Sequence, residues 1–414
     1  MESQYFPINT DTSCRMKWAA STIYLTTGKT ASCHRASVGD IDPNNFGNFH
    51  NLPNKQKDRQ TMLAGQWPGN GCEYCKNIEV NGGYSDRNFQ NTIPEVYPPE
   101  LDSDPTLTSV DPTLLEIFFQ NTCNLSCVYC TEKYSSQIEK ENIRFGGPIQ
   151  KVQRNFLTEN KYSQLSPLLW DWLDKNFHQL KRLQILGGEP LIQQDFTRLV
   201  KFIDTHPNPN LELNFITNLI VKEQNLINTM SLLEKLYNEK KIKTVDILCS
   251  VDCWGLSQEY IRYGFQTATF EKNFEFLLSK PWIRLGILTT VNSLSIPTTV
   301  ELAKKYQHWN SIREIFWHPH VVMPDSSPVN PLAFDYEFWK PYLDQLDQYL
   351  TEDTFNSKNT KDEFEGIKRL LASSNGDCIM QETLLQYLDA IDQRRNLNWR
   401  NIFPWLKEKT TYVV

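Results

Sequence analysis

Three features are missing from this sequence of 414 residues, and each absence narrows the class of protein. No run approaches the roughly 18 apolar residues of a membrane-spanning helix, and residues 1–12 lack the basic start and apolar centre of a secretory signal. Positive charge does not prevail, because 42 Lys and Arg face 49 Asp and Glu and give a formal net charge of −7. We therefore expect a cytoplasmic protein that binds neither membranes nor, through bulk charge, nucleic acids.

Internal repeats and low-complexity tracts are also lacking, whereas apolar residues make up 40% of the chain and aromatic residues 12%. This composition is typical of proteins with packed interiors and argues against intrinsic disorder. At roughly 100 to 200 residues per domain, the length allows two or three domains.

Composition and periodicity divide the chain into four segments. Residues 1–92 are rich in Gly, Pro, Asn and Asp, which predicts a small loop-dominated module with one strand over 21–26. Residues 93–112 are rich in proline and predict a linker. Residues 113–330 alternate short β-rich runs with stretches of helical spacing, and residues 331–414 return to helical spacing alone.

Residues 113–330 are typical of repeated βα units around a parallel sheet. The predicted strands are 114–119, 183–186, 211–216, 245–251, 285–291 and 314–321, with helices over 165–180, 193–204, 223–238 and 297–309. Six units are too few for a closed eight-unit barrel but suit an open one. We predict an α/β fold: a partial (β/α)6 barrel after a small cysteine-containing module, followed by a helical extension with helices over 338–349, 364–372 and 384–394.

Ten cysteines stand out, because a reducing cytoplasm disfavours disulfides and directs clustered cysteines toward metal binding or catalysis. Cys123, Cys127 and Cys130 form a C-x3-C-x2-C loop after the first strand of the predicted barrel, where parallel α/β folds place their chemistry. Three thiolates can hold three irons of a cubane cluster and leave the fourth iron open to a substrate. The alternative, structural zinc, normally needs a fourth protein ligand, and none follows nearby.

This loop, with the aromatic Tyr129 directly before its third cysteine, resembles that of the radical S-adenosylmethionine enzymes. The resemblance implies that Cys123, Cys127 and Cys130 hold a 4Fe-4S cluster and that S-adenosylmethionine binds at its open iron. In this family the reduced cluster donates one electron to the sulfonium, and the resulting 5′-deoxyadenosyl radical abstracts a hydrogen atom from the substrate. A one-electron reductant such as flavodoxin or ferredoxin is implied as a partner.

Strand-end residues extend the resemblance over 114 to about 322, roughly half of the chain. Gly187, Gly188 and Glu189 look like the family's Gly-Gly-Glu motif, in which backbone and carboxylate hold the amino group of the methionine moiety. The resemblance also implies that Arg262 binds the methionine carboxylate, which a guanidinium suits through a two-pronged contact. Ribose or adenine contacts are implied for further strand-end residues, each of which taken singly fits a turn or cap equally well: Asn218, Ser250, Asp252 and Asn292.

Four more cysteines precede the predicted barrel: Cys14, Cys33 and the C-x2-C pair Cys72 and Cys75. With the strand and turn before Cys33, they resemble the SPASM or twitch module of radical enzymes that modify ribosomal peptides, although that module usually follows the barrel. The resemblance implies an auxiliary 4Fe-4S cluster on these four thiolates, with His34 as a substitute ligand. Zinc is the alternative for the same sulfurs.

The carboxyl-terminal segment holds a single cysteine, Cys378, after a turn-rich stretch. Chain length, the supply of cysteines for two clusters and this residue resemble the proteusin-type peptide epimerases, which convert L-residues to D-residues in a ribosomally synthesised precursor peptide with a leader. In that group a radical removes the α-hydrogen and a cysteine thiol returns hydrogen from the other face, the role implied for Cys378. The alternatives are carbon–carbon or thioether crosslinking of the peptide and, more remotely, a zinc-binding scaffold.

Overall fold

The computed structural model describes residues 6–8, 10–33, 38–69, 71–80, 85–92, 97–149, 160–322, 327–351 and 358–407. His34, the predicted substitute ligand, lies outside the described residues. The chain divides into two compact units. Unit 1 comprises Met1–Gln120, Phe156–Phe215 and Ser231–Val245, and unit 2 comprises Asn121–Asn155, Ile216–Met230 and Asp246–Val414.

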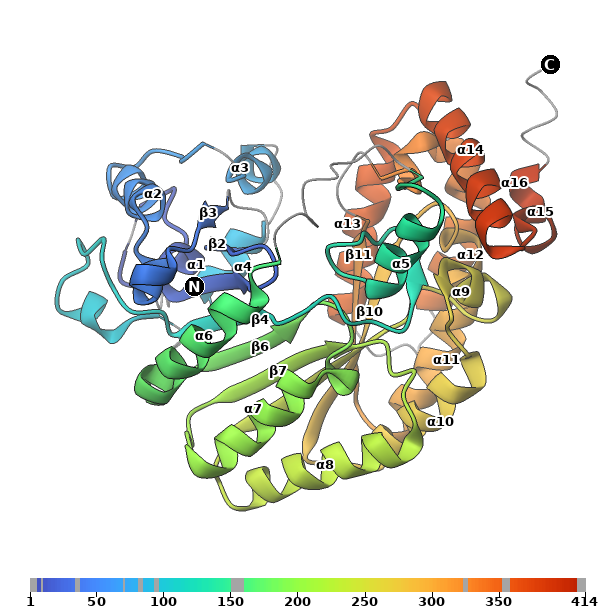
Figure 1. Cartoon of the computed structure of the whole chain (residues 1–414). Helices are drawn as coiled ribbons and strands as arrows, with labels where there is room; N and C mark the ends of the chain where they lie inside the picture. Colours follow the sequence, from blue (N-terminus) through green and yellow to red (C-terminus); the bar gives the residue numbers. More distant parts are fainter. Residues whose placement is uncertain are drawn as a thin grey trace. The chain divides into compact units, whose positions relative to one another are not determined.

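The six predicted barrel strands all form. They are β4 (Leu114–Phe118), β6 (Arg182–Leu186), β7 (Glu212–Thr217), β8 (Thr244–Ser250), β10 (Ile283–Val291) and β11 (Phe316–Val321). Within the described ranges they belong to a nine-stranded sheet with the order β11-β10-β8-β7-β6-β4-β1-β2-β3 (Figure 1). Each of the six lies beside its neighbour in the sequence, without the reversal of doubly wound folds, so the strand order is that of a βα barrel. The predicted α/β class with six βα units is confirmed.

Helices form close to the four predicted ranges. They are α6 (Tyr162–Asn176), α7 (Gln194–Thr205), α8 (Glu223–Asn238) and α11 (Thr299–Ile312). Helix α10 (Thr267–Leu278) is one that the sequence reading did not name. Helix α7 shows why the pattern is readable, because it buries Phe196, Leu199, Val200 and Ile203 at the three-to-four spacing of one helical face.

The amino-terminal segment of unit 1 extends the sheet beyond β4. Strand β1 (Ala20–Tyr24), close to the predicted 21–26, pairs in parallel with β4. Strands β2 (Lys29–Ala31) and β3 (Gly39–Asp40) follow in antiparallel pairing. The segment is more helical than its composition suggested, with α1 (Arg15–Ala19), α2 (Pro53–Leu63), α3 (Glu73–Val80) and α4 (Asp86–Thr92).

The predicted linker contributes to the core of unit 1. Leu101 and Val110, from 93–112, are buried in one apolar cluster with Phe6, Trp18 and Met62. Part of this stretch, 93–96, lies outside the described residues. The segment boundaries drawn from the sequence stay predictions.

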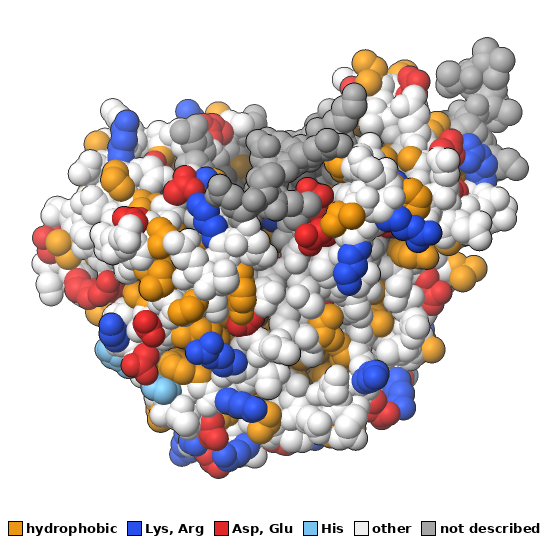
Figure 2. Space-filling view, in the orientation of Figure 1, with side chains coloured by type: hydrophobic (Ala, Val, Ile, Leu, Met, Phe, Trp, Pro, Cys, Tyr) orange, Lys and Arg blue, Asp and Glu red, His pale blue; other side chains and the backbone are white. Residues whose placement is uncertain are grey.

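Unit 2 contains a two-stranded sheet of β5 (Ser126–Cys127) and β9 (Arg262–Tyr263), with α5 (Ser136–Arg144) and α9 (Leu256–Ile261) beside them in the sequence. The carboxyl-terminal extension is helical as predicted, with α12 (Tyr336–Thr351), α13 (Lys358–Ala372), α14 (Cys378–Arg395), α15 (Trp399–Ile402) and α16 (Pro404–Lys407). Lys and Arg side chains are interspersed with Asp and Glu on the face that Figure 2 shows. In the part of the chain that the structure describes, no helix has the length and apolar character needed to cross a membrane.

Candidate functional site

The start of α5 holds the first half of the C-x3-C-x2-C loop in unit 2. Ser135 caps this helix, and its hydroxyl donates to the carbonyl oxygen of Leu125 at 2.6 Å. The hydroxyl oxygen of Ser136 accepts a hydrogen bond of 3.1 Å from the amide of Cys123. The loop is therefore fixed to a helix that begins only six residues after its last cysteine.

The second half of the loop pairs with the strand that carries Arg262. In the β5–β9 ladder, Cys127 lies opposite Arg262. The amide of Val128 donates to the carbonyl of Ile261 at 2.8 Å, and the amide of Cys130 donates to the carbonyl of Cys127 at 3.0 Å. These bonds fix a residue more than a hundred positions away directly beside the second cysteine.

The three thiols of the loop affect one another electrostatically. All three cysteines are half-buried. Burial raises the pKa of the Cys127 thiol, and burial together with the neighbouring sulfurs of Cys127 and Cys123 raises the pKa of Cys130. As free side chains, Cys127 and Cys130 are therefore neutral thiols, and binding of a metal would have to displace their protons.

This donor set fits an iron–sulfur cluster better than a single ion. Across the described ranges, no three Cys, His, Asp or Glu side chains stand in the arrangement of ligands to one metal ion. The three cysteines of a cubane cluster bind three different irons and do not need to meet at one point. The three cysteines are therefore compatible with a cubane cluster, and their role as its ligands stays a prediction.

Three residues predicted to contact the cofactor, Tyr129, Asp252 and Arg262, are hydrogen-bonded together in unit 2. Asp252, fully buried, accepts two hydrogen bonds of 2.9 Å from the guanidinium of Arg262 and one of 2.7 Å from the hydroxyl of Tyr129. The amide of Thr290 donates to the same carboxylate at 2.9 Å. The Arg262 guanidinium also lies 5.5 Å from the centre of the Tyr129 ring. The end of β8, the cysteine loop and β9 are thereby joined through one carboxylate.

Charge compensation allows Asp252 and Arg262 to be buried together. Burial opposes the positive charge of Arg262, but the Asp252 carboxylate outweighs it and raises the arginine pKa well above its usual value. The two charges neutralise each other at close range. A ligand that binds one of the two residues would therefore also meet the charge of the other. The predicted roles of Asp252 toward ribose and of Arg262 toward a carboxylate stay predictions.

Asn218, which follows β7, lies against the cysteine loop. Its side-chain nitrogen donates to Asn124 Oδ1 at 2.9 Å and is 3.9 Å from the sulfur of Cys123. Its Oδ1 accepts from the amide of Ile220 at 2.8 Å, in a turn where Leu219 has a positive φ of 59°. The structure thus brings Asn218 to the predicted cluster ligands.

Asn292 and Ser250, the remaining predicted strand-end residues of unit 2, are buried within their own turn or strand. Asn292 is fully buried, and its side chain bonds within its own turn, to the Thr290 carbonyl at 2.8 Å and the Leu294 amide at 3.0 Å. Ser250 is buried at the last position of β8. Their nucleoside contacts stay predictions, and the hydrogen bonds of Asn292 are those of a turn residue.

The Gly-Gly-Glu motif of unit 1 forms a tight turn after β6. Gly187 and Gly188 have φ values of 76° and 57°, and a Cβ on Gly187 would come within 2.3 Å of the Phe118 ring, so only glycine fits there. Glu189 is fully buried and accepts from the Leu191 amide at 3.0 Å. Recognition of a methionine amino group by this turn stays a prediction.

The amino-terminal cysteines of unit 1 come from separate elements into one electrostatic neighbourhood. Burial raises the pKa of Cys14 to about 12 and that of Cys72 to about 11. The thiol of Cys33 contributes to both increases, whereas the ammonium of Lys17 opposes them. These three cysteines are therefore close enough to interact, with one buried cation among them.

Cys75, in α3, lies near a second cation. The guanidinium of Arg87, from α4, is in the electrostatic field of the thiols of Cys75 and Cys14 and forms an ion pair with Glu79. Its Nη1 also donates to the carbonyl of Ser13 at 2.7 Å. Arg87 is thus a second cation beside the predicted auxiliary ligands, in addition to Lys17.

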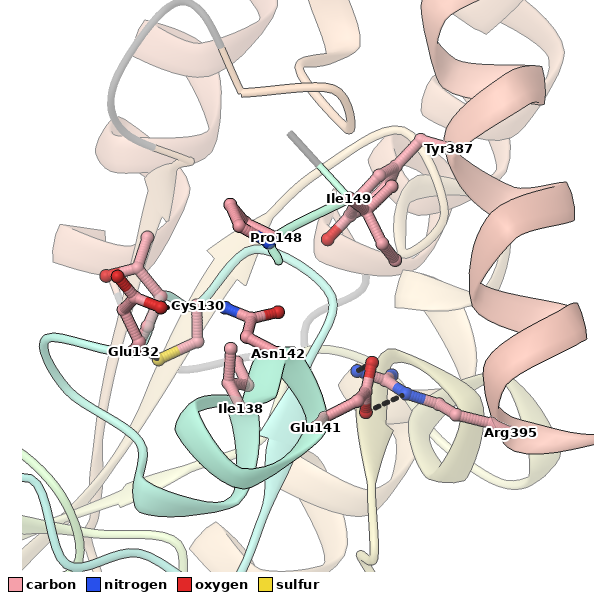
Figure 3. Close-up of a pocket in the computed structure, with 10 residues that line it drawn as sticks. Cys130, Glu132, Ile138, Glu141, Asn142, Pro148, Ile149, Tyr387 and Arg395 are labelled. Atoms are coloured by element: carbon pink, nitrogen blue, oxygen red, sulfur yellow. Dashed lines mark hydrogen bonds and ion pairs between the residues drawn. The ribbon is translucent and has the colours of Figure 1, made fainter. Parts of the chain in front are cut away.

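Cys378 is the exposed first residue of α14. Further along this helix, Tyr387 and Arg395 line a small hollow beside Cys130 (Figure 3). Cys378 does not line this hollow, since nine residues of helix place it about 13 Å from Tyr387 along the helix axis. Its role as a hydrogen donor stays a prediction.

Two residues that the sequence reading missed contact this site. Gln258 is fully buried, and its Oε1 accepts from the amides of Asp252 and Cys253 at 3.0 and 3.2 Å. The hydroxyl of Tyr387 donates to the carbonyl of Val128 at 2.6 Å. Neither residue belongs to a motif, and both lie in ordinary helices, so no local signal distinguishes them.

Comparisons with solved structures give weak similarities. The crystal structure of SuiB from Streptococcus suis bound to S-adenosylmethionine aligns with a TM-score of 0.36 at 14% identity. The form bound to precursor peptide SuiA gives 0.40 at 13% identity, and SuiB itself gives 0.37 at 15% identity. The alignments cover 58%, 75% and 58% of this chain and 45%, 68% and 47% of the SuiB chains. At these values they assign no family. No family model and no curated protein sequence matches the chain.

Proposed function

We propose that this chain is a radical S-adenosylmethionine enzyme that modifies a ribosomally synthesised precursor peptide, and that its reaction converts L-residues to D-residues. The observation that carries the proposal is the cysteine loop. Its backbone is held by α5 on one side and by β9 on the other, and its three cysteines would leave the fourth iron of a cubane cluster without a thiolate from this loop.

The chain's own residues would have distinct tasks. Cys123, Cys127 and Cys130 would hold a 4Fe-4S cluster, which when bound supplies the electron that cleaves S-adenosylmethionine. The pair of Asp252 and Arg262 joins β8 to the cysteine loop and would orient the polar end of the ligand. Cys378, whose thiol is exposed to solvent, would return hydrogen to the peptide.

We also propose that Cys14, Cys33, Cys72 and Cys75 hold a second, auxiliary 4Fe-4S cluster. Cys14 and Cys72 are protonated as free thiols, because burial raises their pKa values to about 12 and about 11. Binding of a metal would therefore release protons and would benefit from the nearby ammonium of Lys17. Zinc is the other candidate for this site.

Crosslinking of the peptide is the second candidate reaction, because the same radical chemistry can end in bond formation with the auxiliary cluster as the electron acceptor. The mass of the product separates the two outcomes. Epimerisation leaves the mass unchanged in ordinary water and introduces solvent deuterium at α-carbons in heavy water. Crosslinking removes two hydrogens for each bond formed and introduces no solvent deuterium.

The test is anaerobic reconstitution with iron and sulfide, followed by incubation with S-adenosylmethionine, a reductant and a candidate precursor peptide in heavy water. We expect release of 5′-deoxyadenosine and deuterated D-residues. Cys378→Ala should keep the iron and the nucleoside release but lose the D-residues. A colourless protein that holds zinc and no iron would overturn the proposal, whereas crosslinked peptide would replace the epimerase reaction alone.

A further inference from the structure

Helix α14 contacts the cysteine loop through one hydrogen bond from a distant part of the chain. The Tyr387 hydroxyl donates to the carbonyl oxygen of Val128 at 2.6 Å, and Val128 is the residue directly after Cys127. The Val128 residue is 1% exposed, so this carbonyl lies in a stretch of backbone with little access to water. A buried carbonyl that loses its donor is costly, which makes the bond a strong restraint on the loop.

Both faces of this peptide segment are restrained. The amide of Val128 donates to Ile261 at 2.8 Å, on the side of β9. Its carbonyl accepts from Tyr387, on the side of α14. The turn between Cys127 and Cys130 is therefore held between two elements that lie more than a hundred residues further along the chain.

Helix α14 is itself fixed to α5, so the tyrosine cannot move away easily. Arg395 and Glu141 form an ion pair of 3.0 Å, which Figure 3 shows beside the hollow near Cys130. Arg394 donates to the carbonyl of Gly147 at 2.8 Å. These contacts lie two helical turns after Tyr387 and orient the helix along the loop.

We propose that Tyr387 is a positioning residue that holds the Cys127–Cys130 turn and makes the cluster bound there easier to reduce. The hydroxyl hydrogen points toward the cysteine loop, so its dipole favours the added negative charge of a reduced cluster. This inference rests on the proposed function, because it assigns the residue a task toward the cluster of that same site.

The experiment compares Tyr387→Phe with a matched control, Tyr306→Phe. Tyr306 is also buried in unit 2, and its hydroxyl also donates to a backbone carbonyl, that of Ile315 at 2.9 Å, far from the cysteine loop in the sequence. The first readout is amide hydrogen exchange of residues 123–135 in the metal-free full-length protein. We expect exchange to become roughly fivefold faster in Tyr387→Phe, the effect of losing one ordinary hydrogen bond, and to stay unchanged in Tyr306→Phe.

The second readout is the reduction potential of the reconstituted cluster, followed by electron paramagnetic resonance. Tyr387→Phe should retain the wild-type iron content and have a lower potential. A fivefold change in the equilibrium constant for a one-electron couple corresponds to about 40 mV, at 59 mV for each factor of ten. Tyr306→Phe should keep the wild-type potential.

A third variant, Glu141→Gln, separates the hydroxyl from the rest of the helix contacts. It weakens the bond to Arg395 but keeps Tyr387, so we expect faster exchange in α5 and a potential that does not fall, because loss of a nearby carboxylate cannot disfavour the more negative reduced cluster. Equal potentials in wild type and Tyr387→Phe, or equal shifts in Tyr387→Phe and Glu141→Gln, would overturn the inference. If the wild type binds no cluster at all, the proposed function fails, whereas the exchange measurement still reports whether Tyr387 restrains the loop.

Discussion

The two cysteine-rich regions of the molecule are built in opposite ways. The loop of Cys123, Cys127 and Cys130 is one short segment whose backbone is hydrogen-bonded to α5 and β9. The thiols of Cys14 and Cys72, by contrast, lie far apart in the sequence, and only the packing of unit 1 brings them into one neighbourhood with Lys17. A site held within one loop keeps its ligands together through local geometry, whereas a dispersed site depends on the fold around it.

We expect the largest effects from substitution of the cysteines in the two regions. If the proposed function holds, Cys127→Ala should reduce 5′-deoxyadenosine release to background, because the proposed cluster loses one of its three thiolates. The double variant of Cys14→Ala and Cys72→Ala should lose about half of the iron and keep nucleoside release without peptide, because the second site does not bind the sulfonium. Iron analysis and chromatography of the nucleoside check both results.

If the double variant retains all of its iron, the amino-terminal thiols hold no cluster. Zinc that disappears from this variant, with iron unchanged, would assign that site to zinc. Loss of nucleoside release in the double variant would mean that the two regions are not independent.

A smaller effect is expected from breaking a buried ion pair instead of an exposed one. Arg262→Gln leaves the Asp252 carboxylate buried without its cation and should lower the free energy of unfolding by about 3 to 5 kcal/mol. The matched control is Arg400→Gln, which breaks the exposed pair with Asp389 and should cost less than about 1 kcal/mol. Urea unfolding at neutral pH measures both values, and equal costs would contradict the structural role of the buried pair.

The smallest effect is a pH dependence in unit 1. Burial, with the nearby charges of Arg59 and Lys55, lowers the pKa of His50 well below its usual 6.5. The unfolded chain therefore binds a proton near pH 6.5 that the folded chain does not, so stability is present above this pH and is lost as the pH falls below it. Between pH 7.5 and 5.5 the His50 contribution should fall by about 1.4 kcal/mol.

Unfolding curves of His50→Gln at the two pH values test this sign, because the variant should lack that part of the pH dependence. The exposed His178, also in unit 1, provides the control His178→Gln, which should keep the wild-type dependence. A wild-type dependence in His50→Gln would mean that other groups titrate instead.

Regular elements were predictable because their signals are local. Strand β6 and helix α8 follow from apolar runs and helical spacing, and the predicted range of α8 agrees with the structure to the residue. The cysteine loop was equally accessible, since its three ligands and their spacing lie within eight residues. Helix α3 was missed because its sequence lies among glycine, asparagine and proline and buries none of its side chains completely.

Contacts across long stretches of chain were not predictable. Tyr387 lies more than 250 residues from Val128, and Lys17 lies about 40 residues from its partner Asp58. Polar side chains of this kind carry no periodic signal, because their roles depend on which segments the tertiary fold places beside them. The pairing of Asp252 with Arg262 was missed although the two lie only ten residues apart, because no sequence pattern shows that the Arg262 side chain returns to the end of β8.

The parallel pairing of β1 with β4 has a consequence for synthesis of the chain. Ala20 pairs with Leu114, so the ribosome makes about ninety residues after β1 before its partner strand exists. Until then one edge of the β1–β2 hairpin stays open to incorrect partners, which is a risk for nascent chains with distant strand pairing. Overproduction of this protein should therefore benefit from slower translation or from chaperones that bind the first hundred residues.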